Sequence, residues 1–163
     1  MKIPFRNIKF FTQIIILSII FNLSLGGCSK YSNEVEANLT KLKKTKACSG
    51  CDLSGVELIS FDLKNADISG ANLKGANLSK SDLTGANLTD TNLNDANLLG
   101  INLTGATLTN TNLTGVKLSY ANISEVEMSN VMLVRAKMNN AKVVNSNISY
   151  TDMTGANLYN ANL

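Results

Sequence analysis

The feature that most constrains this chain is a repeat of five residues that runs without an insertion from residue 51 to residue 163. Residues 71–90, ANLKGANLSKSDLTGANLTD, contain four copies of it. In all 23 copies the third residue is Leu, Ile, Met or Val, and the first is Ala, Ser, Thr, Cys, Val or Ile, with Phe61 the one larger exception. Most copies have Asn or Asp between these two residues. This order predicts a short extended segment with its first and third side chains inside.

A period of five matches neither the 3.6-residue period of a helix nor the two-residue period of a strand. The chain must therefore turn between one copy and the next, and four such turns close a square coil of about 20 residues. Coils of constant length stack, because each coil buries the apolar edge of its neighbour. The repeat therefore predicts a solenoid.

Tandem copies of A(N/D)LxG resemble the pentapeptide-repeat family over 113 of the 163 residues. The resemblance implies an all-β solenoid, a right-handed quadrilateral β-helix. The repeat region would form about 5.6 coils at roughly 4.8 Å per coil, a rod about 27 Å long. Phe61 would stack on the small Ser81, which leaves room for its ring. Eight copies end in Gly, as expected for corners that need unusual backbone angles.

A short capping helix is predicted before the first coil. In NEVEANLTKLKKTKACSGC, residues 33–51, Val35, Leu39 and Leu42 follow helical spacing. Asn33 and Glu36 resemble a capping box at the helix start. Four lysines near the helix end suit the helix dipole, and they are either a solvated face or a contact for an anionic membrane.

The first thirty residues predict an export signal. A basic start is followed by an apolar run of about 16 residues, which is shorter than the roughly 20 of a membrane-spanning helix. The run ends in LGGC, which resembles a bacterial lipobox with Cys28 as the lipidated residue. Ser29 follows in place of Asp, which by the sorting pattern of Gram-negative lipoproteins suggests the periplasmic side of the outer membrane. The alternative is an ordinary signal or anchor that happens to precede a cysteine.

These features divide the chain into a lipoprotein signal peptide (1–27), a linker with the capping helix (28–50) and the repeat β-helix (51–163). The repeat region contains seven basic and ten acidic residues, a net charge of −3. It has no basic stripe of the kind that neutralises phosphates, so we expect no nucleic-acid binding.

Cys48 and Cys51 form a CxxC pair at the junction between the helix and the first coil. The chain has no His and no second CxxC pair to complete a zinc site, so we expect no metal. In an oxidising compartment the pair would form a disulfide, and the alternative is two small buried thiols.

No nucleophile–base arrangement or phosphate-binding loop is present, so we predict that the protein is not an enzyme and holds no cofactor. The outward positions predict polar ladders, in which Asn72, Asn92 and Asn112 stack and hydrogen-bond along the rod. Asp62 and Asp82 also stack, either as solvated carboxylates or as the ligands of a cation.

Apolar residues that interrupt the polar ladders predict a contact patch, although drift of the repeat explains them equally well. Its residues are Met132 and Val134 on one face and Leu99, Tyr120 and Tyr159 on another.

Two functions follow from these features. The first is a membrane-anchored, non-catalytic scaffold of the cell envelope that binds an unknown protein partner. The alternative comes from members of the resembled family that mimic duplex DNA and bind the type II topoisomerase gyrase. Those members are acidic cytosolic rods, whereas this chain has an export signal and a nearly balanced charge. The resemblance also suggests an end-to-end homodimer through the C-terminal coil.

Overall fold

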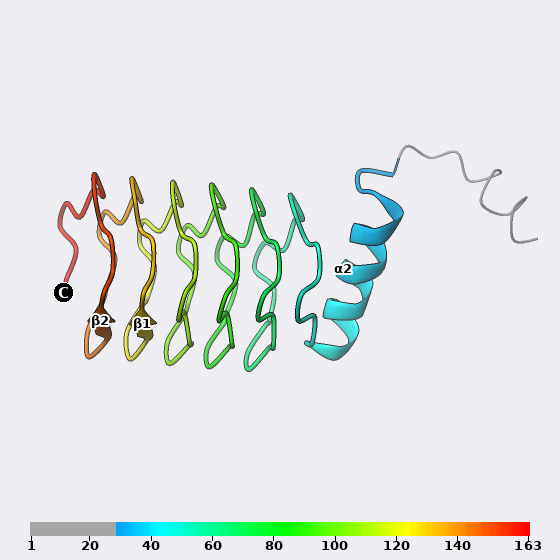
Figure 1. The fold of residues 1–163 in the computed structure, drawn as a ribbon, viewed down its shortest axis with the longest axis horizontal. Coiled ribbons are helices and arrows are strands. Elements are labelled where there is room, and N and C mark those ends of the chain that lie inside the picture. The colour runs from blue at the N-terminus through cyan, green and yellow to red at the C-terminus, as the bar shows by residue number, and fades with distance from the viewer. Residues whose placement is uncertain (1–28) are drawn as a thin grey trace, which may run out of the picture. The chain divides into compact units, whose positions relative to one another are not determined.

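The computed structural model describes residues 29–163 (Figure 1). The predicted signal peptide and the lipidation site at Cys28 lie outside the described residues. The described part contains helix α2 (Asn33–Thr45) and the short strands β1 (Glu127–Ser129) and β2 (Asn147–Ser149). In Figure 1 the helix lies at one end of a stack of coils and the C-terminus lies at the other.

The coils stack in parallel with a step of 20 residues. Strands β1 and β2 pair in parallel with Glu127 opposite Asn147. Elsewhere neighbouring coils pair through single residues at the second position of each copy, such as Asn72 with Asn92. Two of the five residues in each copy form a turn, so little extended backbone remains for longer strands. The predicted all-β solenoid, a right-handed quadrilateral β-helix with a short N-terminal helix, is confirmed.

The four sides of the coil are named here by their first copies. Face A begins with residues 51–55, face B with 56–60, face C with 61–65 and face D with 66–70. Each face continues with the copy 20 residues further along the chain. Faces B and D are therefore opposite sides of the rod.

Almost every backbone amide of a typical copy has a regular partner. The first amide donates to the third residue of the preceding copy, the second donates to the coil before, and the third and fifth donate to the coil after. The fourth amide donates to the side-chain oxygen of the second residue, as Lys74 does to Asn72 Oδ1 at 3.3 Å. Asn and Asp recur at the second position because they accept this bond, which a buried or half-buried amide needs.

The core is a stack of third-position apolar side chains, and Leu53, Leu63 and Leu73 are all completely buried. Inward hydroxyl groups are also satisfied. Thr91 Oγ1 donates to the carbonyl of Ile68 at 3.0 Å, and no side-chain nitrogen or oxygen buried within residues 29–163 lacks a partner. These first-position hydroxyls hydrogen-bond to the backbone of the preceding coil, as well as filling a small space.

Phe61 occupies the predicted place above Ser81. The Ser81 hydroxyl accepts from the Phe61 amide at 3.0 Å and donates to the carbonyl of Leu58. The ring is half-buried, and Lys43 Nζ lies 5.9 Å from its centroid. Helix α2 therefore shields part of the ring that the first coil leaves uncovered.

Every fifth position has a left-handed backbone, with φ between 54° and 70°. This confirms the explanation for the eight glycines, of which Gly115 (φ 70°) is an example. The same angles occur at non-glycine positions such as Tyr120 (φ 59°) and Glu125 (φ 61°), where a Cβ atom makes them less favourable. The corner geometry is thus imposed by the stack, whichever residue stands there.

Helix α2 covers the first coil with Val35, Leu39 and Leu42, whose exposed fractions are 5%, 8% and 0%. The predicted capping box at Asn33 is wrong. Ser32 is the N-cap, because its backbone is extended and its hydroxyl accepts from the amide of Val35 at 3.2 Å. Within residues 29–163 no helix is both long and apolar enough to span a membrane.

Candidate interaction surface

The second-position side chains form hydrogen-bonded ladders along the rod, as predicted. Asn92 Nδ2 donates to Asn72 Oδ1 at 3.2 Å, and Asn97 Nδ2 donates to Asn77 Oδ1 at 3.0 Å. Asn112 continues the first column in register with Asn92. Each bonded Asn uses its oxygen for an amide of its own turn and its nitrogen for the coil before, so the ladder needs no ligand.

Carboxylates stand at the start of these ladders. Asn72 Nδ2 donates to Asp52 Oδ1 at 3.1 Å, and Asn77 Nδ2 donates to Glu57 Oε2 at 2.8 Å. The first side chain of a ladder has only to accept hydrogen bonds, so a carboxylate fits there. Later side chains also need an N–H group to donate to the coil before, which Asn provides. The order of acid before Asn thus has a structural cause.

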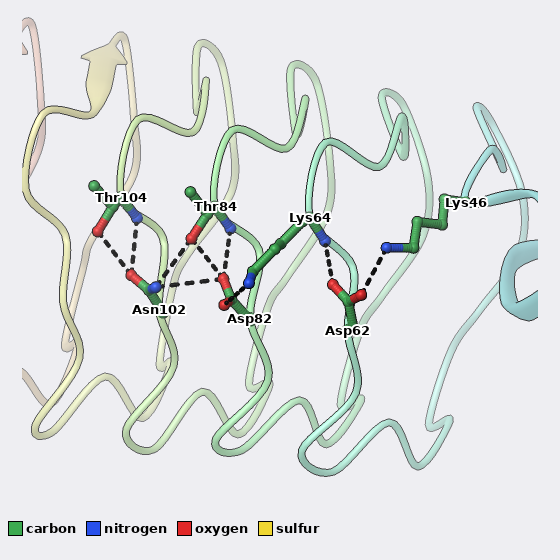
Figure 2. Close-up of polar contacts among 7 residues, drawn as sticks. All are labelled: Lys46, Asp62, Lys64, Asp82, Thr84, Asn102 and Thr104. Carbon is green, nitrogen blue, oxygen red and sulfur yellow. Dashed lines mark hydrogen bonds and ion pairs between the residues drawn. The ribbon is translucent and has the colours of Figure 1, made fainter.

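On face C, lysines lie against the stacked carboxylates that sequence analysis singled out (Figure 2). Lys46 Nζ is 2.9 Å from Asp62 Oδ2, and Lys64 Nζ is 3.2 Å from Asp82 Oδ2. The hydrogen bond from Lys46 lowers the pKa of Asp62, with help from the Lys64 amide. Within residues 29–163 no group of three or more His, Cys, Asp or Glu side chains is placed to hold a metal.

The Asp82 carboxylate is the centre of this arrangement. Thr84 Oγ1 donates to it at 2.5 Å, and Asn102 Nδ2 donates to it at 3.3 Å. Partial burial opposes ionisation of Asp82, but hydrogen bonds from Thr84 and Lys64 outweigh it and lower the pKa of the carboxyl. Asp62 and Asp82 therefore belong to a network that is satisfied within the rod.

The structure places the predicted contact patch on two faces. Met132 is 45% exposed on face A, and Val134 is half-buried at the corner between faces A and B. Leu99, Tyr120 and Tyr159 lie on face B, with exposed fractions of 40%, 67% and 76%.

Sequence reasoning missed three exposed apolar residues. Ile59 is 53% exposed on face B, in the same column as Leu99 and Tyr159. Ile148 and Tyr150 are 38% and 91% exposed on face D. Counting residues 20 apart would have found Ile59, since its column contains polar Ser79 and Ser119 between the apolar members.

Lysines replace Asn or Asp at three second positions, Lys117 and Lys137 on face B and Lys142 on face C, and all three are exposed. A lysine side chain has hydrogen-bond donors but no acceptor, so it cannot accept the hydrogen bond that the backbone amide of the fourth residue in its copy donates. Lys117 and Lys137 are also in register, one directly above the other. Like charges in that arrangement repel. These residues therefore do not contribute to the ladder.

Cys48 and Cys51 are joined by a disulfide between helix α2 and the first coil, with Cα atoms 5.3 Å apart. Both are buried, with exposed fractions of 0% and 8%. The Cys48 amide also donates to the carbonyl of Asp67 at 2.7 Å. The pair thus fastens the entry of the chain into the β-helix.

The profile of the family described as pentapeptide repeats matches residues 48–85, 81–119, 111–149 and 127–163, with eight copies. The matches cover most of the chain, which therefore belongs to the pentapeptide-repeat family. No curated protein matches the sequence.

Solved structures of pentapeptide-repeat proteins are similar to this chain. QnrB1, a plasmid-mediated fluoroquinolone resistance protein, aligns with a TM-score of 0.58 and 24% identity over 72% of this chain and 64% of QnrB1. HetL, involved in heterocyst differentiation regulation in the cyanobacterium Nostoc sp. strain PCC 7120, is 30% identical over 72% of this chain and 59% of HetL, with a TM-score of 0.33. The pentapeptide-repeat protein alr5209 of Nostoc PCC 7120 is 24% identical over 71% of this chain and 93% of alr5209, with a TM-score of 0.49. This chain spans less than two thirds of QnrB1 and of HetL, and at this identity the likeness to QnrB1 concerns the fold.

Proposed function

We propose that the protein is a lipid-anchored, non-catalytic scaffold of the cell envelope, in which a rigid rod presents its faces to a protein partner. The observation that carries the proposal is the LGGC sequence at residues 25–28, directly after a basic and apolar export signal. Diacylglycerol on the Cys28 thiol and a further acyl chain on the new N-terminus would exceed the two signals needed for stable anchoring. In a Gram-negative host, Ser29 favours the periplasmic side of the outer membrane.

The chemistry of the described surface supports a structural role. Its polar ladders are hydrogen-bonded within the rod, as Asn92 is to Asn72. Asp62 and Asp82, two of the carboxylates with lowered pKa values, lie against Lys46 and Lys64. A surface whose polar groups are already paired within the rod suits a scaffold, because a partner can bind it without any chemical reaction taking place.

The three cysteines provide the test and its control. Full-length chain with Cys28→Ala should move from the membrane fraction to the soluble fraction of its bacterial host. Full-length chain with Cys48→Ser and Cys51→Ser should remain in the membrane fraction, because the disulfide lies in the folded part. Membrane retention of the Cys28→Ala chain, at the level of the wild type, would contradict the proposal.

The alternative function is mimicry of DNA towards a type II topoisomerase, for which the fold shared with QnrB1 is the support. Duplex DNA carries one charge per 1.7 Å, so a rod of about 27 Å would replace roughly 16 phosphates. The repeat region has ten acidic residues and seven basic ones. The charge therefore favours the scaffold. Gyrase supercoiling that is unchanged by a large excess of this protein would remove the alternative.

The end of the last coil supports a homodimer as a further proposal. Its inward residues Met153 and Leu158 are half-buried, and Leu163 is 66% exposed. A second copy placed end to end would cover them. Sedimentation equilibrium should then show a dimer that Leu158→Asp converts to a monomer, whereas a wild-type monomer at all concentrations would contradict it.

A further inference from the structure

Face B combines positive charge with exposed apolar side chains. Its charged residues are Lys80, Lys117, Lys137 and Glu57. The opposite face D has three acidic residues and no Lys or Arg; these acids are Asp67, Asp90 and Glu127. Two sides of one rod therefore carry opposite net charge.

The exposed apolar residues of face B form a row along one corner. Ile59, Leu99 and Tyr159 occupy the same column at the fourth position of their copies, with exposed fractions of 53%, 40% and 76%. Tyr120, 67% exposed, is at the fifth position of the neighbouring column. At about 4.8 Å per coil, the members of the column lie roughly 10 and 14 Å apart. The row thus extends along most of the rod.

The lysines of face B are not used within the fold. Among residues 29–163, Lys117 and Lys137 form no ion pair, in contrast to Lys46 and Lys64, which pair with Asp62 and Asp82 on face C. They stand in register, so their charges repel each other in the absence of an anionic partner. An anionic surface against face B would remove this repulsion.

We propose that face B lies against an anionic lipid surface, with its lysines at the headgroups and its Tyr and Leu side chains at the interface. Tyr and Lys are the residues that place an apolar body at the membrane boundary and a polar end in the headgroups. The inference rests on the proposed lipid anchor at Cys28, and it specifies how the anchored rod is oriented.

The size of face B favours a membrane over a second copy or an acidic protein. Six copies span about 24 Å along the rod and three extended residues about 10 Å across, roughly 240 Å² in all. A stable protein interface buries about 800 Å² on each partner. Such a small surface can orient a body that is already held nearby, but it cannot hold a partner from solution.

The anchor would hold the rod close enough for this contact. Four residues, 29–32, separate Cys28 from helix α2. Even fully extended, they reach only about 14 Å. The capped end of the rod would therefore remain near the bilayer, and the charge and apolar row of face B would decide which side turns towards it.

The experiment uses full-length protein purified from the membrane fraction and reconstituted in vesicles of phosphatidylcholine, with or without roughly one third phosphatidylglycerol. An environment-sensitive dye is attached through Ser119→Cys on face B or through Thr109→Cys on face D. Both sites are half-buried fourth positions. In anionic vesicles a lipid-borne quencher should quench the dye at residue 119 at least threefold more than the dye at residue 109. The difference should fall with added salt, because surface charge is screened.

Two charge variants distinguish the faces. Lys117→Glu with Lys137→Glu should abolish the difference in quenching, and the fold tolerates Glu at this position, as Glu57 and Glu127 show. Lys74→Glu with Arg135→Glu makes the same change of charge on the copies of face A, and it should leave the difference unchanged.

Three results would overturn the inference. Equal quenching at the two sites in lipidated, vesicle-bound protein would reject the orientation while leaving the anchor intact. The dye at residue 119 could instead be protected from both the lipid-borne and an aqueous quencher, with protection that increases with protein concentration. That result would show that a second copy covers face B. Protein with an unmodified Cys28 that does not bind vesicles would reject the anchor, and the orientation with it.

Discussion

Faces B and D are built from the same repeat and the same backbone, yet they differ in charge and in exposed apolar area. Their inward residues are alike, since Leu98 on face B and Leu88 on face D are both 1% exposed. Their outward residues differ, as Lys117 on face B and Glu127 on face D illustrate. The inward positions therefore determine the fold, whereas the outward positions are free to acquire a function.

The largest expected effect tests the equivalence of the two interiors. Leu98→Ala and Leu88→Ala should each lower the free energy of unfolding by about 3 kcal/mol, because each leaves a cavity between stacked coils. Leu99→Ala, on the exposed corner of face B, is the control and should change it by less than about 0.5 kcal/mol. Urea unfolding measures all three. A much smaller loss for one of the two core variants would show that the interiors are not equivalent.

A smaller effect tests whether the lysines at the second positions of face B lower the free energy of unfolding relative to Asn. Lys117→Asn and Lys137→Asn should each raise the free energy of unfolding by about 0.5–1 kcal/mol. The Asn side chain can accept the hydrogen bond from the backbone amide of the fourth residue in its copy, and it extends the ladder. Asn87→Ala on face D should lower it by about 1 kcal/mol, since it removes the bonds to the Thr89 amide and to Asp67. Destabilisation by the Lys→Asn changes would contradict the structural account of the second position.

The corners should respond alike on both faces. Tyr120→Gly on face B and Tyr150→Gly on face D both relieve a left-handed backbone, with φ values of 59° and 54°. Each should raise the free energy of unfolding by about 0.5 kcal/mol, a balance between relieved strain and the greater freedom of glycine in the unfolded chain. Gly115→Ala is the opposite change, and it should be destabilising because φ is 70° and Asp95 Oδ1 lies where the new Cβ would stand. Thermal melting of the three variants provides the comparison.

The smallest effect is expected from pH. Hydrogen bonds from the hydroxyls of Ser69 and Ser49 lower the pKa of Asp67 on face D. The unfolded chain then binds the proton more readily than the folded one, so this contribution is present above the unfolded pKa of about 4. It is lost as the pH falls from there through the lower folded pKa. Melting temperature should therefore drop below pH 4, and less steeply in Asp67→Asn. An identical pH profile for that variant would contradict the assignment.

The period of five predicted a solenoid because it is incompatible with a long helix or strand, and the resemblance to the pentapeptide-repeat family supplied the right-handed quadrilateral β-helix. It also predicted the helix cover by Val35, Leu39 and Leu42, whose spacing is characteristic of one apolar face. The N-cap was misplaced by one residue, since Ser32 and Asn33 are both good capping residues and only the backbone angle distinguishes them.

Other features required coordinates. The role of the Ser81 hydroxyl in the turn of the preceding coil depends on contacts between residues 23 apart. The left-handed angles at Tyr120 and Glu125 have no local signal, because neither residue favours them and only the stack imposes them. The opposite charges of faces B and D needed no coordinates, because counting the copies in steps of 20 residues assigns them to the sides of the rod.

The lipid anchor at Cys28 can be tested by measuring the intact mass and the N-terminal peptide of the protein from the membrane fraction of its native host. We expect a chain that begins at an acylated Cys28 and contains the Cys48–Cys51 disulfide. An unprocessed chain that begins at Met1 in the soluble fraction would contradict the anchor and the orientation of face B, and topoisomerase binding would become the first activity to assay.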